Sequence, residues 1–426
     1  MSVSNPRREA YRILRRVEEA GAFASALLES RPPSRDQRDA ALVTEIVLGV
    51  LRRRAVIDHA VARVASRPID GIEPAVREAL RVGTYSILFL DRVPDFAAVD
   101  TAVTLVKEAG HAKAAGFVNG VLRRVAREGE ALLPPAPVRG DAAALALYRS
   151  HPAWWVERLV RRLGWEEADA LLAADNEPAA TTLAPRGPGL AEALAREGVV
   201  TEPCAEVPGA LRVTSGVPQQ TEAFRAGAFW MQDEASQRVV RLFGDRVGPR
   251  VADVCAAPGG KSLGLAARLA KGGVVVALDR HAHRLRRVVA NAGRVGVTSI
   301  VTVAADMTRE APLAGTFDDV LVDAPCSGTG TLRRHPEIRW RLRPDDLPVL
   351  AARQRKILAS AAALVRPGGR LGYAVCSLEP EEGEEVVASF LDAHPAFSRT
   401  GEILRTSPAH APQDGFYAVL LTRRSE

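Results

Sequence analysis

Long apolar segments are absent from this sequence, and no apolar run approaches the roughly 20 residues that a membrane-spanning helix needs. The first residues, MSVSNPRREAYRIL, also lack the apolar core of a signal peptide. We therefore expect a cytoplasmic protein that does not bind membranes. Hydrophobic residues make up 47% of the chain, and the mixture with charged residues is typical of a globular enzyme.

Cysteine is scarce, with four residues in a chain of 426: Cys204, Cys255, Cys326 and Cys376. None of them forms a C-x-x-C pair, so we expect no zinc site and no bound metal. In a reducing compartment the four should be thiols rather than disulfides. Free thiols are more often small core residues than nucleophiles, so only the surrounding sequence can assign one a role in catalysis.

Lysine is rare as well, and nearly all of the positive charge comes from arginine, with a net charge of +6. Arginine is well suited to phosphate contacts and to stacking on bases. The abundance of alanine, however, favours a GC-rich coding bias as the explanation of the total. Any nucleic-acid signal must therefore come from local clusters of charge.

The hydrophobic pattern divides the first 245 residues into three parts. Residues 1–130 carry apolar side chains at helical spacing between prolines, which predicts an all-helical domain. Residues 131–150 begin as a Pro-rich stretch, and we expect a linker there. Residues 151–245 combine a predicted helical pair with short strand-like runs, as in a small α+β subdomain.

From residue 246 to residue 426 the pattern alternates predicted strands and helices. The strands read RVADVC, GVVVALD, IVTVAAD, FDDVLVD and GRLGYAVC, and DGFYAVLLTRR near the end is expected to add one more. Near-continuous apolar strands between helices indicate a mostly parallel sheet that is covered on both faces. The fold class is therefore α/β, with a Rossmann-like domain at the carboxyl end of the chain.

The loop CAAPGGK (255–261) follows the first of these strands and opens a helix. Small side chains at Ala256, Ala257, Gly259 and Gly260 would let a ligand approach the backbone, and the helix amino end offers N–H donors to a carboxylate. The loop matches neither the dinucleotide fingerprint nor the P-loop. A tight turn would be enough to explain the two glycines if nothing else pointed to a ligand.

Three aspartates at the ends of successive strands do point to a bound ligand. Asp279 ends the second strand about 20 residues beyond the loop, where an acidic group commonly binds ribose hydroxyls. Asp306 ends the third strand and Asp323 the fourth. One such carboxylate is commonly a helix cap, but three suit a nucleoside that carries an amino acid. We predict S-adenosylmethionine, with Asp279 at the ribose, Asp306 at the adenine side and Asp323 at the methionine or substrate side.

Cys326 and Cys376 each follow a predicted buried strand, in FDDVLVDAPCSGTG and GRLGYAVCSLEPEEGEE. Ligands in open α/β sheets bind at the carboxyl ends of the strands. Two thiols at the same edge as a cofactor loop indicate covalent catalysis, but the residues alone do not rank one thiol above the other. Cys255 is expected to pack inside the cofactor loop, and Cys204 to be structural.

Four segments, DVCAAPGGKS, DAPCSGTGTLRRHPEIRW, YAVCSLEPEEGEE and QDGFYAVLL, together resemble the NOL1/NOP2/Sun family of RNA cytosine-C5 methyltransferases. The amino-terminal segments GVLRRRAVIDHAV, REALRVGTYSILFLDRVP and AGFVNGVLRRV look like the NusB antitermination-factor fold. The fusion is similar to bacterial methyltransferases of 16S ribosomal RNA. The resemblance implies a class I methyltransferase domain with a seven-stranded sheet over 246–426, an RNA-binding NusB-like domain over 1–130, and a monomer.

The resemblance also implies roles for single residues. Cys376 would be the nucleophile that bonds to C6 of cytosine, Cys326 would help to release the product, and Asp323 would act at the reacting base. The implied cofactor contacts are Cys255, Ala256, Ala257, Pro258, Gly259, Gly260, Lys261, Asp279, Asp306 and Asp323. The family usually has threonine before the nucleophile where this chain has Val375, and TTLAPRGP lacks an Arg-x-Asn that is often found there.

The segment LRRHPEIRWRLRP (332–344) follows the Pro-Cys loop directly and interleaves five arginines with His335 and Trp340. Beside a catalytic site we expect these side chains to contact RNA phosphates and to stack on bases. The alternative is a loop with the tryptophan packed beneath it.

Two other functions are weighed against RNA methylation. DNA cytosine methyltransferases place their nucleophile in a Pro-Cys motif, so duplex DNA is an alternative substrate that would favour Cys326. A non-catalytic RNA-binding or antitermination module is the second alternative. It is disfavoured because binding alone needs neither thiol.

Overall fold

The computed structural model describes residues 6–31, 36–65, 67–91, 93–311, 313 and 316–425. The chain folds into two compact units. Unit 1 contains Met1–Pro178 together with Leu332–Leu342, and unit 2 contains Ala179–Thr331 together with Arg343–Glu426. The described residues form no helix of the length and apolarity that crossing a membrane requires.

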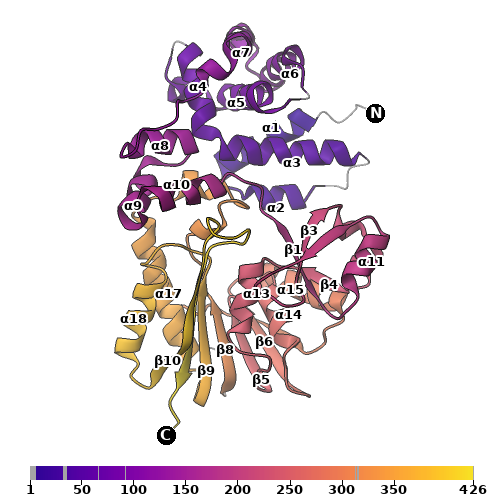
Figure 1. Cartoon of the computed structure of the whole chain (residues 1–426), viewed down its shortest axis with the longest axis vertical. Helices are drawn as coiled ribbons and strands as arrows, with labels where there is room; N and C mark the ends of the chain where they lie inside the picture. The colour runs from indigo at the N-terminus through magenta and orange to yellow at the C-terminus, as the bar shows by residue number, and fades with distance from the viewer. Residues whose placement is uncertain are drawn as a thin grey trace. The chain divides into compact units, whose positions relative to one another are not determined.

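Unit 1 is helical, as predicted (Figure 1). Its helices are α1 (Pro6–Ala20), α2 (Ala24–Glu29), α3 (Gln37–Arg52), α4 (Arg54–Ala65), α5 (Pro74–Phe89), α6 (Asp95–Glu108), α7 (Ala115–Glu128), α8 (Ala142–Arg149), α9 (Ala153–Leu163), α10 (Trp165–Ala174) and α16 (Ile338–Arg341). Helix α5 begins with a proline, and the Glu73 side chain caps it by accepting from the Val76 N–H. It is buried along most of its length and contacts α1, α3, α4, α6 and α7, so the core of the bundle forms around it.

Two expected boundaries differ from the division into units. Residues 142–149, which we assigned to the linker, form α8, because Asp141 caps an alanine-rich segment whose Leu145 and Ala146 are buried. The expected subdomain over 151–245 is split at Pro178, with α9 and α10 in unit 1 and the strands that follow in unit 2.

Unit 2 begins with a small antiparallel sheet of strand order β2-β3-β1-β4. Its strands are β1 (Thr181–Pro185), β2 (Val200–Pro203), β3 (Leu211–Ser215) and β4 (Phe229–Met231), and α11 (Leu190–Arg196) and α12 (Glu222–Arg225) lie in the connections. Buried Leu183, Leu194 and Phe229 form its small core.

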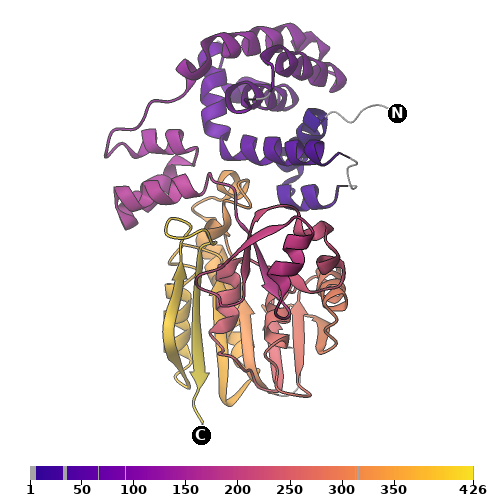
Figure 2. The same ribbon diagram turned by 45° about the vertical axis from the view of Figure 1, so that its right-hand side comes forward.

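The main sheet of unit 2 has seven strands in the order β10-β11-β9-β8-β5-β6-β7, which confirms the predicted fold class (Figure 2). The strands are β5 (Arg250–Val254), β6 (Val274–Asp279), β7 (Ile300–Ala304), β8 (Phe317–Asp323), β9 (Val365–Val375), β10 (Phe397–Thr406) and β11 (Phe416–Arg423). Among these, β11 is antiparallel to both of its neighbours, and the other pairs are parallel. Strand β10 was missing from our expected strands because it is an edge strand with mostly exposed residues.

Helices cover both faces of this sheet, as the apolar strands require. Apolar side chains of α17 (Asp346–Ala362) and α18 (Glu384–Ala393) pack on one face with Val320, Val322 and Tyr373. On the other face α13 (Glu234–Arg241), α14 (Gly260–Ala266) and α15 (Ala282–Val295) cover residues such as Val251, Ala277 and Leu321. The carboxyl ends of β5 to β9 therefore meet at one edge, where the predicted site residues lie.

Candidate active site

Cys326 and Cys376 lie next to each other although 50 residues separate them in the sequence. Strands β8 and β9 are parallel neighbours whose last paired residues are Asp323 and Ala374, so both cysteines follow at the same edge. The two Sγ atoms are 3.4 Å apart. The hydrogen bond with Cys376, together with burial, raises the pKa of the Cys326 thiol well above its ordinary value. Cys326 therefore holds its proton more tightly than an ordinary thiol does.

Lys261 and Asp323 form an ion pair at the same edge, with 2.8 Å between Nζ and Oδ2. The Lys261 ammonium also lies 5.0 Å from the centre of the Phe416 ring. Burial favours the neutral amine, but the interaction with Asp323 and the nearby Cys376 outweigh it and raise the pKa of Lys261. A fixed positive charge thus faces the Asp323 carboxylate beside the two thiols.

The predicted cofactor loop turns back at the end of β5. Cys255 has a φ of 66°, a left-handed conformation that is strained for a residue with a side chain. Gly259 has a φ of 105°, and a Cβ there would lie 3.1 Å from the Val288 Cα. The Ala256 N–H donates to the Leu278 carbonyl at 2.7 Å, which holds the loop against β6. Burial raises the pKa of Cys255 to about 12, in keeping with a thiol that packs in the loop.

Asp279 and Asp306 lie at the ends of β6 and β7, beside this loop. Asp279 Oδ1 accepts from the His281 N–H at 2.9 Å. Its Oδ2 is buried and accepts no hydrogen bond from a described residue, although Arg284 Nη1 lies 3.4 Å away. Hydrogen bonds from the side chain and N–H of Thr308 lower the pKa of Asp306, which stays charged. A buried acceptor left open beside a loop of small residues fits a ligand with hydroxyl groups.

Comparisons with known proteins agree with this geometry. Residues 244–422 match the family model described as 16S rRNA methyltransferase RsmB/F, and residues 4–127 match the NusB family. The chain is 34% identical over 407 residues to "probable ribosomal RNA small subunit methyltransferase B" of Bacillus subtilis (strain 168), covering 93% of this chain and 90% of the relative. The chain belongs to the RsmB/F family of methyltransferases. The resemblance seen in the sequence motifs is thereby confirmed.

Solved structures show the same fold in distant proteins. The crystal structure of PH0851 matches with a TM-score of 0.83 and 24% identity, covering 99% of this chain and 100% of that one. NSun6 from Pyrococcus horikoshii, solved with SFG, matches with a TM-score of 0.57 and 19% identity over 63% of this chain and 97% of its own. These likenesses establish the architecture of the RsmB/F chain.

A buried carboxylate that we did not predict links the two cysteine loops of this RsmB/F chain. Glu382 Oε1 accepts from the Ser327 N–H at 2.8 Å and from Gln354 Nε2 at 2.9 Å. Its Oε2 accepts from the Ser377 hydroxyl at 2.6 Å and from the Ser327 hydroxyl. The sequence holds two signals for this cluster, because each cysteine is followed by a serine and an acidic run follows Cys376.

Arg339, in the arginine-rich segment after the Pro-Cys loop, does not have the role that we expected. Arg339 is only 2% exposed, and its guanidinium donates to Asn176 Oδ1 at 2.8 Å, to the Ser150 carbonyl at 3.2 Å and to the Asp175 carbonyl at 3.0 Å. Trp340 Nε1 donates to the Leu51 carbonyl at 2.7 Å. The prediction that Arg339 contacts RNA is therefore wrong, and the same prediction for the half-buried Trp340 stays a prediction. Both side chains join the segment to the helices of unit 1.

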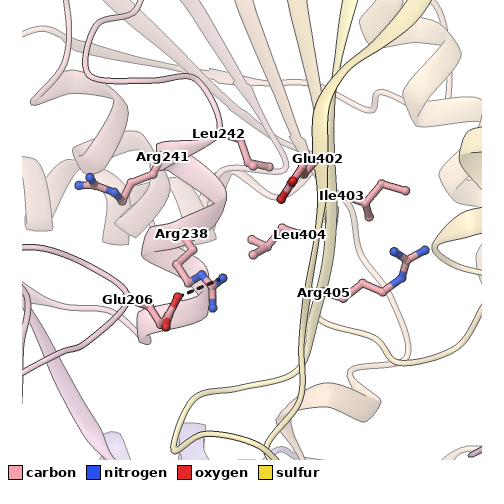
Figure 3. A pocket seen from close by; sticks show the side chains of 8 residues that line it. All are labelled: Glu206, Arg238, Arg241, Leu242, Glu402, Ile403, Leu404 and Arg405. Carbon is pink, nitrogen blue, oxygen red and sulfur yellow. Dashed lines mark ion pairs between the residues drawn. The ribbon is translucent and has the colours of Figure 1, made fainter.

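A hollow of about 310 Å³ lies between α13 and β10, and Figure 3 shows the side chains around it. Its lining includes Glu206, Glu402, Arg238, Arg241 and Arg405, and Glu206 pairs with Arg238 at 3.5 Å. Mixed charges of this kind select neither an anion nor a cation. None of the described residues that line it belongs to the predicted site, so the cysteine pair and the cofactor loop mark the candidate active site.

Proposed function

We propose that this chain methylates C5 of a cytosine in 16S ribosomal RNA and that S-adenosylmethionine is the methyl donor. The observation that carries the proposal is the 3.4 Å separation of the Cys326 and Cys376 sulfurs, next to the Lys261–Asp323 pair. One thiol is enough for nucleophilic addition, and a second one in contact with it serves the later release. The relative in Bacillus subtilis, named for the small-subunit ribosomal RNA, supports the choice of substrate.

The loop and the carboxylates at the sheet edge would hold the cofactor, which supplies an electrophilic methyl group when it is bound. The open Oδ2 of Asp279 can accept from a ribose hydroxyl, and Asp306 lies one strand further, on the expected adenine side. The backbone at Gly259 and Gly260 carries no side chain that would keep a ligand away. A distant protein of the same fold was solved with SFG, an S-adenosylmethionine analogue, which supports this assignment.

Cys376 is the proposed nucleophile. Carbon 5 of cytosine attacks a methyl donor poorly, but addition of a thiolate to C6 turns the ring into an enamine whose C5 is a much better nucleophile. Cys326 holds its proton more tightly than an ordinary thiol does, which favours Cys376 as the attacking sulfur. Protonation of N3 by solvent would neutralise the negative charge that this addition places on the ring, and the Asp323 carboxylate, held by Lys261, could accept a hydrogen bond from the resulting N3–H. Water then takes the C5 proton, and the electrons of the C5–H bond restore the C5–C6 double bond and expel the Cys376 sulfur. The Cys326 thiol can donate a hydrogen bond to the departing thiolate.

Replacement of the two cysteines should have opposite effects on the covalent protein–RNA adduct. RNA that contains 5-fluorocytidine traps this adduct, because its C5 has no proton to lose. Cys376→Ala should abolish both methylation and the covalent protein–RNA adduct. Cys326→Ala should still form the covalent bond to normal RNA but release it slowly, so that an adduct accumulates. Denaturing gels with labelled RNA measure both outcomes, and Cys204→Ala is the matched control that should behave like the unchanged protein.

Two results would contradict these assignments. Adduct formation by Cys376→Ala together with its loss in Cys326→Ala would reverse the roles and favour the Pro-Cys cysteine. Transfer of labelled methyl groups to duplex DNA in preference to ribosomal RNA would favour the alternative substrate. The raised pKa of Cys326 argues against the first result. Bisulfite sequencing of 16S RNA from a deletion strain identifies the modified position.

A further inference from the structure

Each cysteine of the candidate site is followed by a serine, and both serines donate to the same carboxylate. Ser327 binds Glu382 through its N–H at 2.8 Å and through its hydroxyl, and the Ser377 hydroxyl binds it at 2.6 Å. Glu382 is fully buried, and both of its oxygens accept two hydrogen bonds. Hydrogen bonds to a buried carboxylate are stronger than those between neutral groups, so the position of Glu382 constrains both loops.

The sheet itself does not extend far enough to hold the thiols. Pairing of β8 with β9 ends at Asp323 and Ala374, before either cysteine. Beyond this point the backbone contributes the bond from the Ala324 N–H to the Ala374 carbonyl at 2.9 Å and the bond from the Gly330 N–H to the Cys376 carbonyl at 3.1 Å. Both cysteine side chains therefore project from loop residues, and their spacing depends on what fixes those loops.

Two further elements hold Glu382 in place. Gln354 on α17 donates its amide to Glu382 Oε1 at 2.9 Å and to the Pro325 carbonyl at 3.0 Å, directly before Cys326. Tyr373 on β9 donates its hydroxyl to the Glu382 carbonyl at 2.6 Å. The carboxylate is thus tied to a helix and to a strand while it binds the two loops, so it cannot follow one loop away from the other.

We infer that Glu382 is a positioning residue that sets the distance between the two thiols by binding the serine next to each. It acts through Ser327 and Ser377, and no contact with substrate or cofactor is needed for this role. The importance of this distance for catalysis rests on the proposed function, whereas the distance between the two thiols is a feature of the structure. The inference can therefore be tested by a reaction that needs neither RNA nor cofactor.

Phenylarsine oxide is a suitable probe because trivalent arsenic bonds to two thiols that lie close together. Its arsenic–oxygen double bond is exchanged for two arsenic–sulfur bonds, and the two thiol protons leave with the oxygen as water. The unchanged protein should capture the arsenical reversibly, and Cys326→Ser should not. Glu382→Ala should weaken the capture at least about tenfold, the equivalent of roughly 1.4 kcal/mol, because the loops lose their common acceptor.

Glu382→Gln should keep near-normal capture, because its amide oxygen can accept from the two N–H donors while its amino group donates to the hydroxyls. Glu385→Gln, an exposed change in the same acidic run, is the matched control and should have no effect. Unchanged capture in Glu382→Ala overturns the inference. An equal loss in Glu382→Ala and Glu382→Gln also overturns it, because charge rather than position would then be responsible. If Glu382→Ala does not fold, the double variant Ser327→Ala with Ser377→Ala takes its place. The same weakening of arsenical capture is expected, and unchanged capture overturns the inference.

The second measurement is the rate of the covalent reaction with RNA that contains 5-fluorocytidine. Glu382→Ala should lower the maximal rate about 100-fold, as small displacements of reacting groups do, with no change in the RNA concentration at half-maximal rate. An equal maximal rate in the variant contradicts the inference. Absence of any adduct with the unchanged protein rejects the proposed function instead, and the arsenical measurement then stands by itself.

Discussion

At the scale of single residues, the environment of Asp253 is unusual because it opposes the charge of a carboxyl group. Asp253 is fully buried two residues before the cofactor loop, and Ser262 donates to it at 2.5 Å. Burial, reinforced by the nearby Asp323 and Asp279, raises the pKa of Asp253 to about 7 despite this hydrogen bond. The protonated form is therefore favoured in the folded protein, whereas an unfolded chain ionises the same group near pH 4.

Asp253→Asn should make the protein less sensitive to rising pH. The favourable contribution of protonated Asp253 is complete below about pH 4 and is lost as the pH rises through about 7. The variant resembles the protonated form, so its free energy of unfolding relative to the unchanged protein should rise over this range. The rise is at most about 1.4 kcal/mol per pH unit. Urea unfolding at several pH values measures it, and parallel curves for the two proteins would contradict the prediction.

At the scale of elements, the cysteine loops depend on close contacts between backbone segments. A Cβ added at Gly330 would lie 2.0 Å from the carbonyl oxygen of Gly415, and the Gly415 N–H donates to the Gly330 carbonyl at 2.7 Å. Gly330 also donates its N–H to Cys376. The short helix Thr329–Thr331 is thus held between the loop that carries Cys376 and the segment that precedes β11. Only glycine leaves room for this approach.

Gly330→Ala should reduce methylation about 10- to 100-fold while the chain still folds, because the loop that carries Cys326 must move away from Gly415. Methyl transfer and thermal unfolding are measured on the same samples. Gly293→Ala is the matched control, since nothing lies within 4 Å of the added Cβ inside α15. It should leave methylation unchanged and stabilise the protein by up to about 1 kcal/mol. Full activity in Gly330→Ala would show that the contact is dispensable.

At the scale of the whole molecule, the chain leaves unit 2 after Thr331, adds Leu332–Leu342 to unit 1 and then returns. Arg339 is the buried centre of that segment, and burial lowers its pKa to about 10. Three of its acceptors come from the ends of α8 and α10, which are distant from it in the sequence. Unit 1 is therefore complete only when this segment is present.

Arg339→Ala should destabilise unit 1 by several kcal/mol, because each buried acceptor left without a donor costs about 1–3 kcal/mol. Thermal unfolding followed by circular dichroism should show a helical transition at lower temperature than in the unchanged chain. Arg343→Ala, an exposed arginine just outside the segment, is the control and should unfold normally. The same unfolding temperature in both variants would contradict a structural role for Arg339.

The sequence by itself determined the parts of this protein that depend on local pattern. Apolar runs between helices predicted the parallel sheet, and the loop 255–261 with Asp279, Asp306 and Asp323 was expected at its edge because parallel strands place their carboxyl ends together. Cys326 and Cys376 were expected there for the same reason. The motifs around these cysteines also identified the family, because members of a family share the short segments around a reactive group in the same order along the chain.

Only the tertiary structure decided which polar groups meet. Glu382 binds Ser327 from 55 positions away, and Arg339 is separated from Asn176 by 163 positions, so no local pattern indicated either contact. The same arginine-rich sequence suits an RNA surface or a buried set of backbone acceptors, and burial alone distinguishes the two. Strand β10 likewise exists through pairing with β11 rather than through its own polar residues. The physical reason is that burial and hydrogen bonding depend on neighbours in space, which long-range folding brings together.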